Sequence, residues 1–160
     1  MRPLVNCRVL FLLFLFWPIR AAGAEEIWSL QITNPKTEKI LWETAVRPGD
    51  SFTLDYVHSS DHTPVQDRFR IGEDGGIVLE EERYLWSGAG LDSHPPDGTL
   101  DYTGRWTRVR LHRAFPRFLL RVGEVAGHRL TVNGKTLPLL GIAKGRERVW
   151  IHVTKNSNPK

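Results

Sequence analysis

Ionisable side chains occupy positions in three predicted β-strands where the pattern of residues favours apolar side chains. They are His58, Asp67, Glu81 and Arg83. Successive side chains of a strand point to opposite faces, so residues of one parity share a face. The apolar residues of matching parity are Phe52, Leu54 and Tyr56; Val65, Phe69 and Ile71; and Ile77, Leu79 and Leu85. Because an ionised group is costly to bury unless it is paired, we expect the four to meet in a polar pocket or an internal salt-bridge network. The alternative is that they lie at strand ends that face water.

The segment that joins the first two of these strands carries further groups able to do chemistry. It contains Ser59 and Thr63, whose hydroxyls follow His58 in the chain. A histidine beside a serine is found in hydrolases, and His58 with Asp67 or Glu81 could act as an acid–base pair. However, no Gly-x-Ser-x-Gly motif surrounds Ser59, and adjacent residues of a strand point apart. We therefore assign no catalytic residue, and a hydrolase-like enzyme stays as an alternative function.

The histidines do not have the spacing of a metal site. His58, His62, His94 and His112 have carboxylates nearby in the sequence, but no His-Glu-x-x-His or similar motif is present. We expect neither a bound metal nor a cofactor.

A basic segment runs from Arg105 to Arg121. Its arginines are Arg105, Arg108, Arg110, Arg113, Arg117 and Arg121. Such a segment can bind phosphate headgroups, an anionic ligand or an acidic partner surface. It can also be a solvated face that is balanced by the acidic residues Glu80, Glu81 and Glu82. The sequence leaves both interpretations open.

The elements that must position these residues are short strands. Runs rich in Val, Ile, Leu, Thr and aromatic residues alternate with turn residues, which is typical of antiparallel sheets. The predicted strands cover residues 27–33, 39–46, 51–58, 65–71, 77–85, 106–112, 117–122, 128–133, 135–140 and 148–153. About ten strands in a chain of this length predict one all-β domain, an antiparallel β-sandwich or flattened barrel.

Turn residues support this interpretation. Asn133-Gly134 suits a two-residue hairpin loop, Asp74-Gly75-Gly76 a similar one, and Arg47-Pro48-Gly49-Asp50 a type II turn. Residues 87–104 are rich in Gly, Pro and Asp and have no strand pattern, so we expect a long surface loop there.

The N-terminus has the features of a secretion signal. Arg2 and Arg8 precede the apolar run Val9–Trp17, and small residues follow at 21–24. The run is too short for a membrane-spanning helix, which needs about 20 apolar residues. We therefore expect a signal peptide at 1–24, an all-β domain at 25–155 and a frayed tail at 156–160. The protein would then be periplasmic or extracellular, or, alternatively, anchored to the membrane by an uncleaved N-terminus.

Cleavage would change both the cysteine content and the charge. The one cysteine, Cys7, lies within residues 1–24, so no disulfide partner is expected in the remaining chain. Three of the 22 basic residues, Arg2, Arg8 and Arg20, would also be removed, which leaves 19 against 18 acidic residues. This balance does not support a nucleic-acid partner.

Three segments of the chain carry a family resemblance. They are FTLDYVHSSDHTPVQDRF (52–69), IVLEEERYLWSGAGL (77–91) and GHRLTVNGKTLPL (127–139). They resemble a small bacterial and archaeal family classed as a domain of unknown function, whose members are often encoded beside TRAP transporters of the TAXI type. The matching motif residues are His58-Ser59, Thr63-Pro64, Asp67, Glu81 and Gly88-Ala89-Gly90. Residues 91–94, Leu-Asp-Ser-His, stand where the family has a more Pro-rich continuation.

The resemblance implies an exported accessory binding protein of an organic-anion transport system. Its partners would be the transporter's solute receptor or membrane subunits, or a small organic anion. The implied site is a polar cluster of His58, Ser59, Thr63, Asp67, Glu81, Gly88, Ala89 and Gly90. We expect the Gly-Ala-Gly backbone to approach this cluster with N–H groups that could hold a ligand carboxylate. A structural β-sandwich without a site is the remaining alternative.

Overall fold

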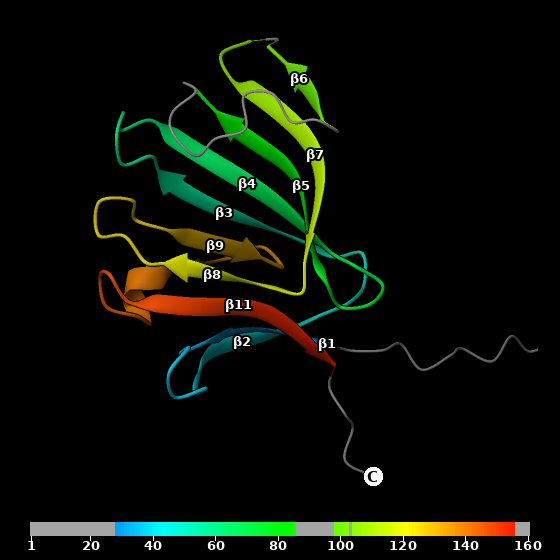
Figure 1. Ribbon diagram of the computed structural model, residues 1–160, viewed down its shortest axis with the longest axis vertical. Helices are drawn as coiled ribbons and strands as arrows, with labels where there is room; N and C mark the ends of the chain where they lie inside the picture. The colour runs from blue at the N-terminus through cyan, green and yellow to red at the C-terminus, as the bar shows by residue number, and fades with distance from the viewer. Residues whose placement is uncertain (1–27, 86–97, 103, 156–160) are drawn as a thin grey trace, which may run out of the picture.

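The protein folds as two antiparallel β-sheets packed into a sandwich (Figure 1). The computed structural model describes residues 28–85, 98–102 and 104–155. The small sheet has the order β2-β1-β11-β8. Its strands are β1 (Trp28–Thr33), β2 (Ile40–Val46), β8 (Arg117–Arg121) and β11 (Arg148–Lys155). The all-β sandwich predicted from the sequence is therefore confirmed.

The large sheet has the order β10-β9-β3-β4-β5-β7-β6. Its strands are β3 (Ser51–Val57), β4 (Pro64–Ile71), β5 (Ile77–Tyr84), β6 (Thr99–Asp101), β7 (Thr107–Phe115), β9 (Arg129–Val132) and β10 (Lys135–Pro138). A 3₁₀ turn, η1 (Leu139–Gly141), follows β10. β6 corrects the expectation of a strand-free loop over 87–104, because residues 99–101 pair with β7 and form an edge of the sheet.

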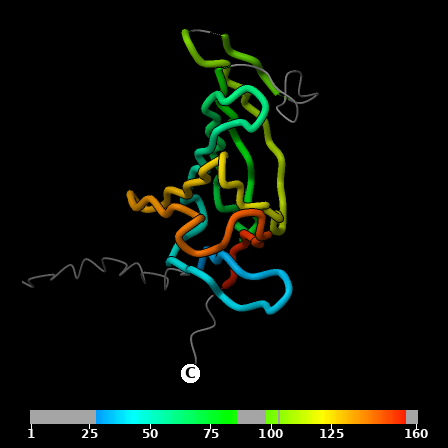
Figure 2. Tube along the Cα trace, turned by 90° about the vertical axis from the view of Figure 1, so that its left-hand side faces the viewer, coloured from blue at the N-terminus to red at the C-terminus, as the bar shows by residue number. Residues whose placement is uncertain are grey.

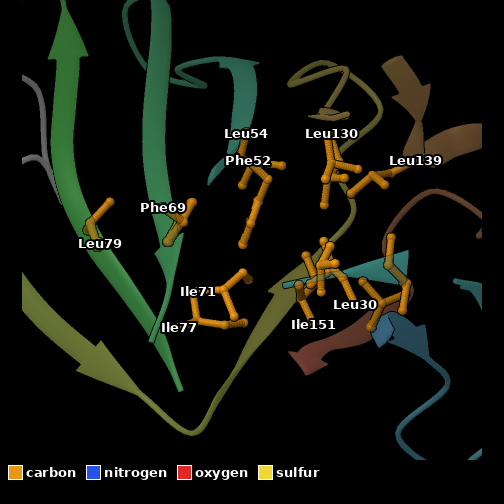
Figure 3. Close-up of a cluster of buried hydrophobic side chains, with 14 of the residues drawn as sticks. Leu30, Phe52, Leu54, Phe69, Ile71, Ile77, Leu79, Leu130, Leu139 and Ile151 are labelled. Atoms are coloured by element: carbon orange, nitrogen blue, oxygen red, sulfur yellow. The ribbon is translucent and has the colours of Figure 1, made fainter. Parts of the chain in front are cut away.

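The chain passes from one sheet to the other at Pro116, between β7 and β8. β7 pairs with β5 in the large sheet, whereas β8 pairs with β11 in the small one. Proline has no N–H to donate to a strand ladder, so it suits the point where pairing stops. Figure 3 shows the two strands as the arms of a V, with the side chains of Ile71 and Ile77 between them.

The main core fills the space between the sheets. Its fully buried members include Leu30 and Ile151 from the small sheet and Ile71, Ile77 and Leu130 from the large one (Figure 3). Burial of such side chains is the main source of stability in a domain without disulfides.

The large sheet extends beyond the small one. In Figure 2 the upper part of the molecule contains strands of the large sheet, while β1, β2 and β11 lie in the lower part. A separate apolar cluster of Val65, Tyr84 and Val109 occupies the inner face of this extension. Of the predicted polar residues, Asp67 lies between this cluster and the main core.

Candidate functional site

A tight hairpin loop at residues 58–63 joins β3 to β4. The His58 N–H donates to the Thr63 carbonyl at 2.8 Å, and the His62 N–H donates to the His58 carbonyl at 2.9 Å. The side chain of His58 bonds through Nδ1 to the Asp61 carboxylate, and the Ser60 hydroxyl lies 3.0 Å from the same nitrogen. Sequence analysis did not single out Asp61. The partner of His58 in this loop is thus a local carboxylate, within the turn itself.

A β-bulge in β5 changes which glutamate faces the interior. Arg68 of β4 pairs with Glu81 and the next residue, Phe69, pairs with Leu79, so Glu80 has no partner across the ladder. An extra residue of this kind reverses the facing of the residues that follow it. As a result Glu82 is buried, at 7 % exposure.

The bulge overturns the parity prediction for Glu81 and Arg83. Both lie on the outer face of the large sheet, where the Glu81 carboxylate binds Arg83 and lies 3.4 Å from Nε of Arg108. Glu80 also binds an arginine, Arg70. The prediction that Glu81 and Arg83 meet His58 and Asp67 in the core is therefore wrong. The extra residue at Glu80 turns the side chains that follow it to the other face of the sheet.

Asp67 and Glu82 form a pair of carboxyl groups in the inner face of the large sheet. They are register partners on β4 and β5, and both are buried. Leu54 of β3 is the next partner on one side, and Val109 of β7 is the next on the other. The two carboxyl groups therefore lie in an apolar row, between the main core and the Val65, Tyr84 and Val109 cluster.

The environment of Asp67 favours its protonated form. Burial, the largest cause, and the negative charges of Glu82 and Asp55 together raise the pKa of Asp67 to about 7, while a hydrogen bond from Tyr56 opposes the rise. The same burial and the neighbouring carboxylates raise the pKa of the Tyr56 hydroxyl above its ordinary value, so it stays protonated and donates to Asp67. One oxygen of Asp67, Oδ1, is buried without a hydrogen-bond partner. A neighbouring negative charge such as that of Glu82 disfavours ionisation of a buried carboxyl group.

His128 supports Tyr56 from the other side. Its ring centroid lies 5.4 Å from that of Tyr56, and its Nδ1 accepts the N–H of Gly123 at 3.2 Å. Burial lowers the pKa of His128, so the neutral ring predominates at neutral pH. Sequence analysis missed both His128 and the inward role of Glu82. The turn at residues 124–127, which precedes His128, is held against β3 by the Val57 N–H, which donates to the Ala126 carbonyl at 2.8 Å.

An open groove, which we call the outer groove, lies across the outer side of the large sheet near the ends of β3 and β4. Its volume is about 490 Å³, and it is lined by residues 55–57, 64–66 and 125–127 together with Arg83, Trp106 and Arg129. Trp106 and Val125 are exposed apolar side chains. The Gln66 amide donates to Asp55 at 2.7 Å across the floor. Tyr56 belongs both to this lining and to the Asp67 hydrogen bond.

The other residues of the predicted cluster are placed as follows. Thr63 lies at the end of the hairpin loop, and its hydroxyl is buried without a hydrogen-bond partner. Ser59 is exposed at the tip of the loop. Gly88, Ala89 and Gly90 lie outside the described residues, as does most of the segment 87–104. The structure thus places Asp67 in a buried acidic pair, His58, Ser59 and Thr63 on one hairpin, and Glu81 on the opposite face.

Within residues 28–85, 98–102 and 104–155, no group of three or more His, Cys, Asp or Glu side chains has an arrangement that could hold a metal ion. No helix in the same residues has both the length and the apolar composition to cross a membrane.

Comparison with known proteins gives a family. No curated protein and no solved structure matches the chain. A family model described as "Domain of unknown function (DUF1850)" matches residues 52–139. The match covers more than half of the chain and includes β3, β4, β5 and β9, which carry the acidic pair and most of the outer groove. The chain therefore belongs to the DUF1850 family.

Proposed function

We propose that this protein is an exported accessory binding protein that takes a small organic anion in the outer groove and serves a TAXI-type TRAP transport system. The observation that carries the proposal is the lining of the groove, where the exposed Trp106 and Val125 lie beside two arginines, Arg83 and Arg129. An apolar wall with a few placed cations is the usual composition of a site for a small carboxylate.

Arg129 is the stronger candidate for the anion. It is exposed at the start of β9 and forms no ion pair with any residue that the structure describes. Arg83, in contrast, is already bound to Glu81. Asp55, the register partner of Arg129, has its Oδ1 engaged by the Gln66 amide. A ligand carboxylate can therefore approach Arg129 without displacing an existing ion pair.

The transport association rests on the family resemblance. Members of the resembled family are often encoded beside TAXI-type TRAP transporters, which import organic anions. An exported protein with a small-anion groove would fit beside a soluble receptor or the membrane subunits of such a system. We propose a periplasmic or extracellular location on the pattern of residues 1–24.

Export predicts a defined N-terminus. N-terminal sequencing of the protein from a periplasmic or secreted fraction should begin at Glu25, because Ala22-Gly23-Ala24 has the small residues of a cleavage site. Recovery of the chain with Met1 in a membrane fraction would contradict cleavage and favour an N-terminal anchor.

Anion binding in the outer groove is tested with succinate and benzoate as probes. Arg129→Ala should weaken binding of the better probe by about tenfold to a hundredfold, the range of a hydrogen bond to a charged group. Isothermal titration calorimetry measures the effect. The matched control is Arg68→Ala, since Arg68 is also exposed on the outer face and lies outside the groove. Equal losses in the two variants, or no binding of either probe, would contradict the proposal.

An acid–base enzyme is the second candidate, and the observation that favours it is the raised pKa of Asp67, a property common at catalytic carboxyl groups. Tyr56 donates to this carboxyl group and is also one of the residues that line the outer groove. His58 and Glu81 are less well placed as its partners, because His58 bonds to Asp61 and Glu81 bonds to arginines. Asp67→Asn separates the candidates, because a binding protein keeps its probe affinity while an enzyme that uses Asp67 loses turnover.

A further inference from the structure

A second groove lies on the small sheet, and most of its lining falls outside residues 52–139. Its volume is about 650 Å³. One wall is the β1–β2 turn at Asn34–Lys36, the other is formed by Arg146, Glu147 and Arg148, and Leu119 and Trp150 complete the lining. We call it the small-sheet groove. Leu119 and Trp150 are register partners on β8 and β11, so they lie side by side.

Both walls are held by hydrogen bonds. In the first, the Asn34 side chain accepts the N–H groups of Lys36 and Thr37 at 2.9 and 3.2 Å. In the second, the Arg146 N–H donates to the Val122 carbonyl at 2.7 Å, and the Lys144 N–H donates to the Glu147 carboxylate at 2.9 Å. The groove is therefore formed before any ligand arrives, which lowers the entropic cost of binding.

The charge of the groove is positive. Lys36, Arg146 and Arg148 are exposed, and none of them forms an ion pair with a residue in the described part of the chain. The single acidic lining residue, Glu147, has one oxygen committed to the Lys144 N–H. Arg146 also adopts φ +70°, an uncommon conformation for a residue other than glycine. Such strain is found more often at functional sites than elsewhere.

Trp150 and Leu119 are the apolar side chains that the two strands contribute to the groove. Trp150 is half-buried, and Leu119 beside it is 41 % exposed. The guanidinium group of Arg117 lies 4.3 Å from the centroid of the Trp150 ring. This contact holds the indole in one orientation and adds a further positive charge nearby.

We propose that the small-sheet groove binds a planar organic anion with two negative charges, such as an aromatic dicarboxylate. The ring of the ligand lies against Trp150 and Leu119. Its carboxylates bind Arg146 and Arg148, whose guanidinium groups suit bidentate pairing with carboxylates. Lys36 adds a charge from the opposite wall. This site is separate from the outer groove and does not depend on the function proposed there.

Isophthalate and glutarate are the probes that test the site, since both carry two carboxylates and only isophthalate has a ring. Calorimetric titration of the full chain should show tighter binding of isophthalate. Arg148→Ala and Arg146→Gly should each weaken isophthalate binding by about tenfold or more. Glycine is chosen at position 146 because it removes the charge and accepts the positive φ without strain. Trp150→Leu should reduce the preference for isophthalate over glutarate.

Two controls make the outcomes distinct. Arg110→Ala removes an exposed arginine of the large sheet that likewise forms no ion pair with a described residue, and it should leave isophthalate binding unchanged. Titrations in the Arg129→Ala background measure the small-sheet groove alone, because this variant removes the proposed anion contact of the outer groove. Circular dichroism confirms that each variant is folded. The proposal is overturned if isophthalate does not bind, if it binds no tighter than glutarate, or if Arg110→Ala weakens binding as much as Arg148→Ala.

Discussion

Asp67→Asn is expected to raise the free energy of unfolding above neutral pH by about 2 to 4 kcal/mol. This is the range that corresponds to the change in the pKa of Asp67 on folding. The pKa of Asp67 rises from 3.8 to about 7 on folding. An asparagine has nearly the same shape and carries no charge at any pH. Its amide oxygen can still accept the hydrogen bond from Tyr56, and it carries no charge for Glu82 to repel.

The sign of the pH dependence follows from which state holds the proton. Below about pH 4 Asp67 is protonated in both states, and its full contribution to stability is present. Between about pH 4 and pH 7 the unfolded chain loses the proton while the folded protein keeps it. The free energy of unfolding of the wild type therefore falls as the pH rises through this window. The Asp67→Asn variant does not lose stability in this window. The difference between its free energy of unfolding and that of the wild type therefore grows from pH 4 to pH 8.

Urea denaturation at several pH values between 4 and 8 measures the effect as a difference between variant and wild type. Glu82→Gln should give part of this stabilisation, because the substitution removes the charge next to Asp67 and leaves the burial of Asp67 in place. Glu73→Gln, at an exposed position, is the control and should follow the wild type. Parallel stability curves for Asp67→Asn and wild type would show that Asp67 ionises normally in the folded protein.

The strands were predictable because alternation and turn chemistry are local. Asn133 and Gly134 have φ values of +51° and +72°, and Gly49 has +88°, as the hairpin and type II turns predicted from those residues require. Asp67 was found by the same reasoning, because the alternation in β4 is unbroken from Val65 to Ile71.

The rest of the site depends on contacts between strands. The exchange of Glu81 for Glu82 follows from the bulge at Glu80, and only the register with β4 reveals it. Three consecutive glutamates give no sign of which one faces inward. His128 meets Tyr56 across a long separation in sequence, and a single histidine before a strand carries no local signal. Trp106 and Arg129 join one groove because β7 and β9 lie in the same sheet, which parity within a strand cannot predict.

Phe69→Ala is the second substitution with a large expected effect, since Phe69 joins the two sheets. Its ring stacks on Phe52 at 4.8 Å between centroids and on Phe118 at 5.1 Å. Phe52 and Phe69 belong to the large sheet, whereas Phe118 lies on β8 of the small one. Phe69 is 4 % exposed, so its removal leaves a cavity between the sheets.

The expected loss in the free energy of unfolding is about 3 to 5 kcal/mol, the usual cost of a buried phenylalanine changed to alanine. Phe69→Leu should lose less, because it keeps much of the volume. Leu119→Ala is the surface control, with an expected change of about 0.5 kcal/mol or less. A double-mutant cycle of Phe69→Ala with Phe118→Ala should give a coupling of about 0.5 to 1.5 kcal/mol for the aromatic pair. Additive losses would mean that the rings do not interact, and the two sheets would then be held together by the aliphatic core around Leu30, Leu130 and Ile151 rather than by the phenylalanine stack.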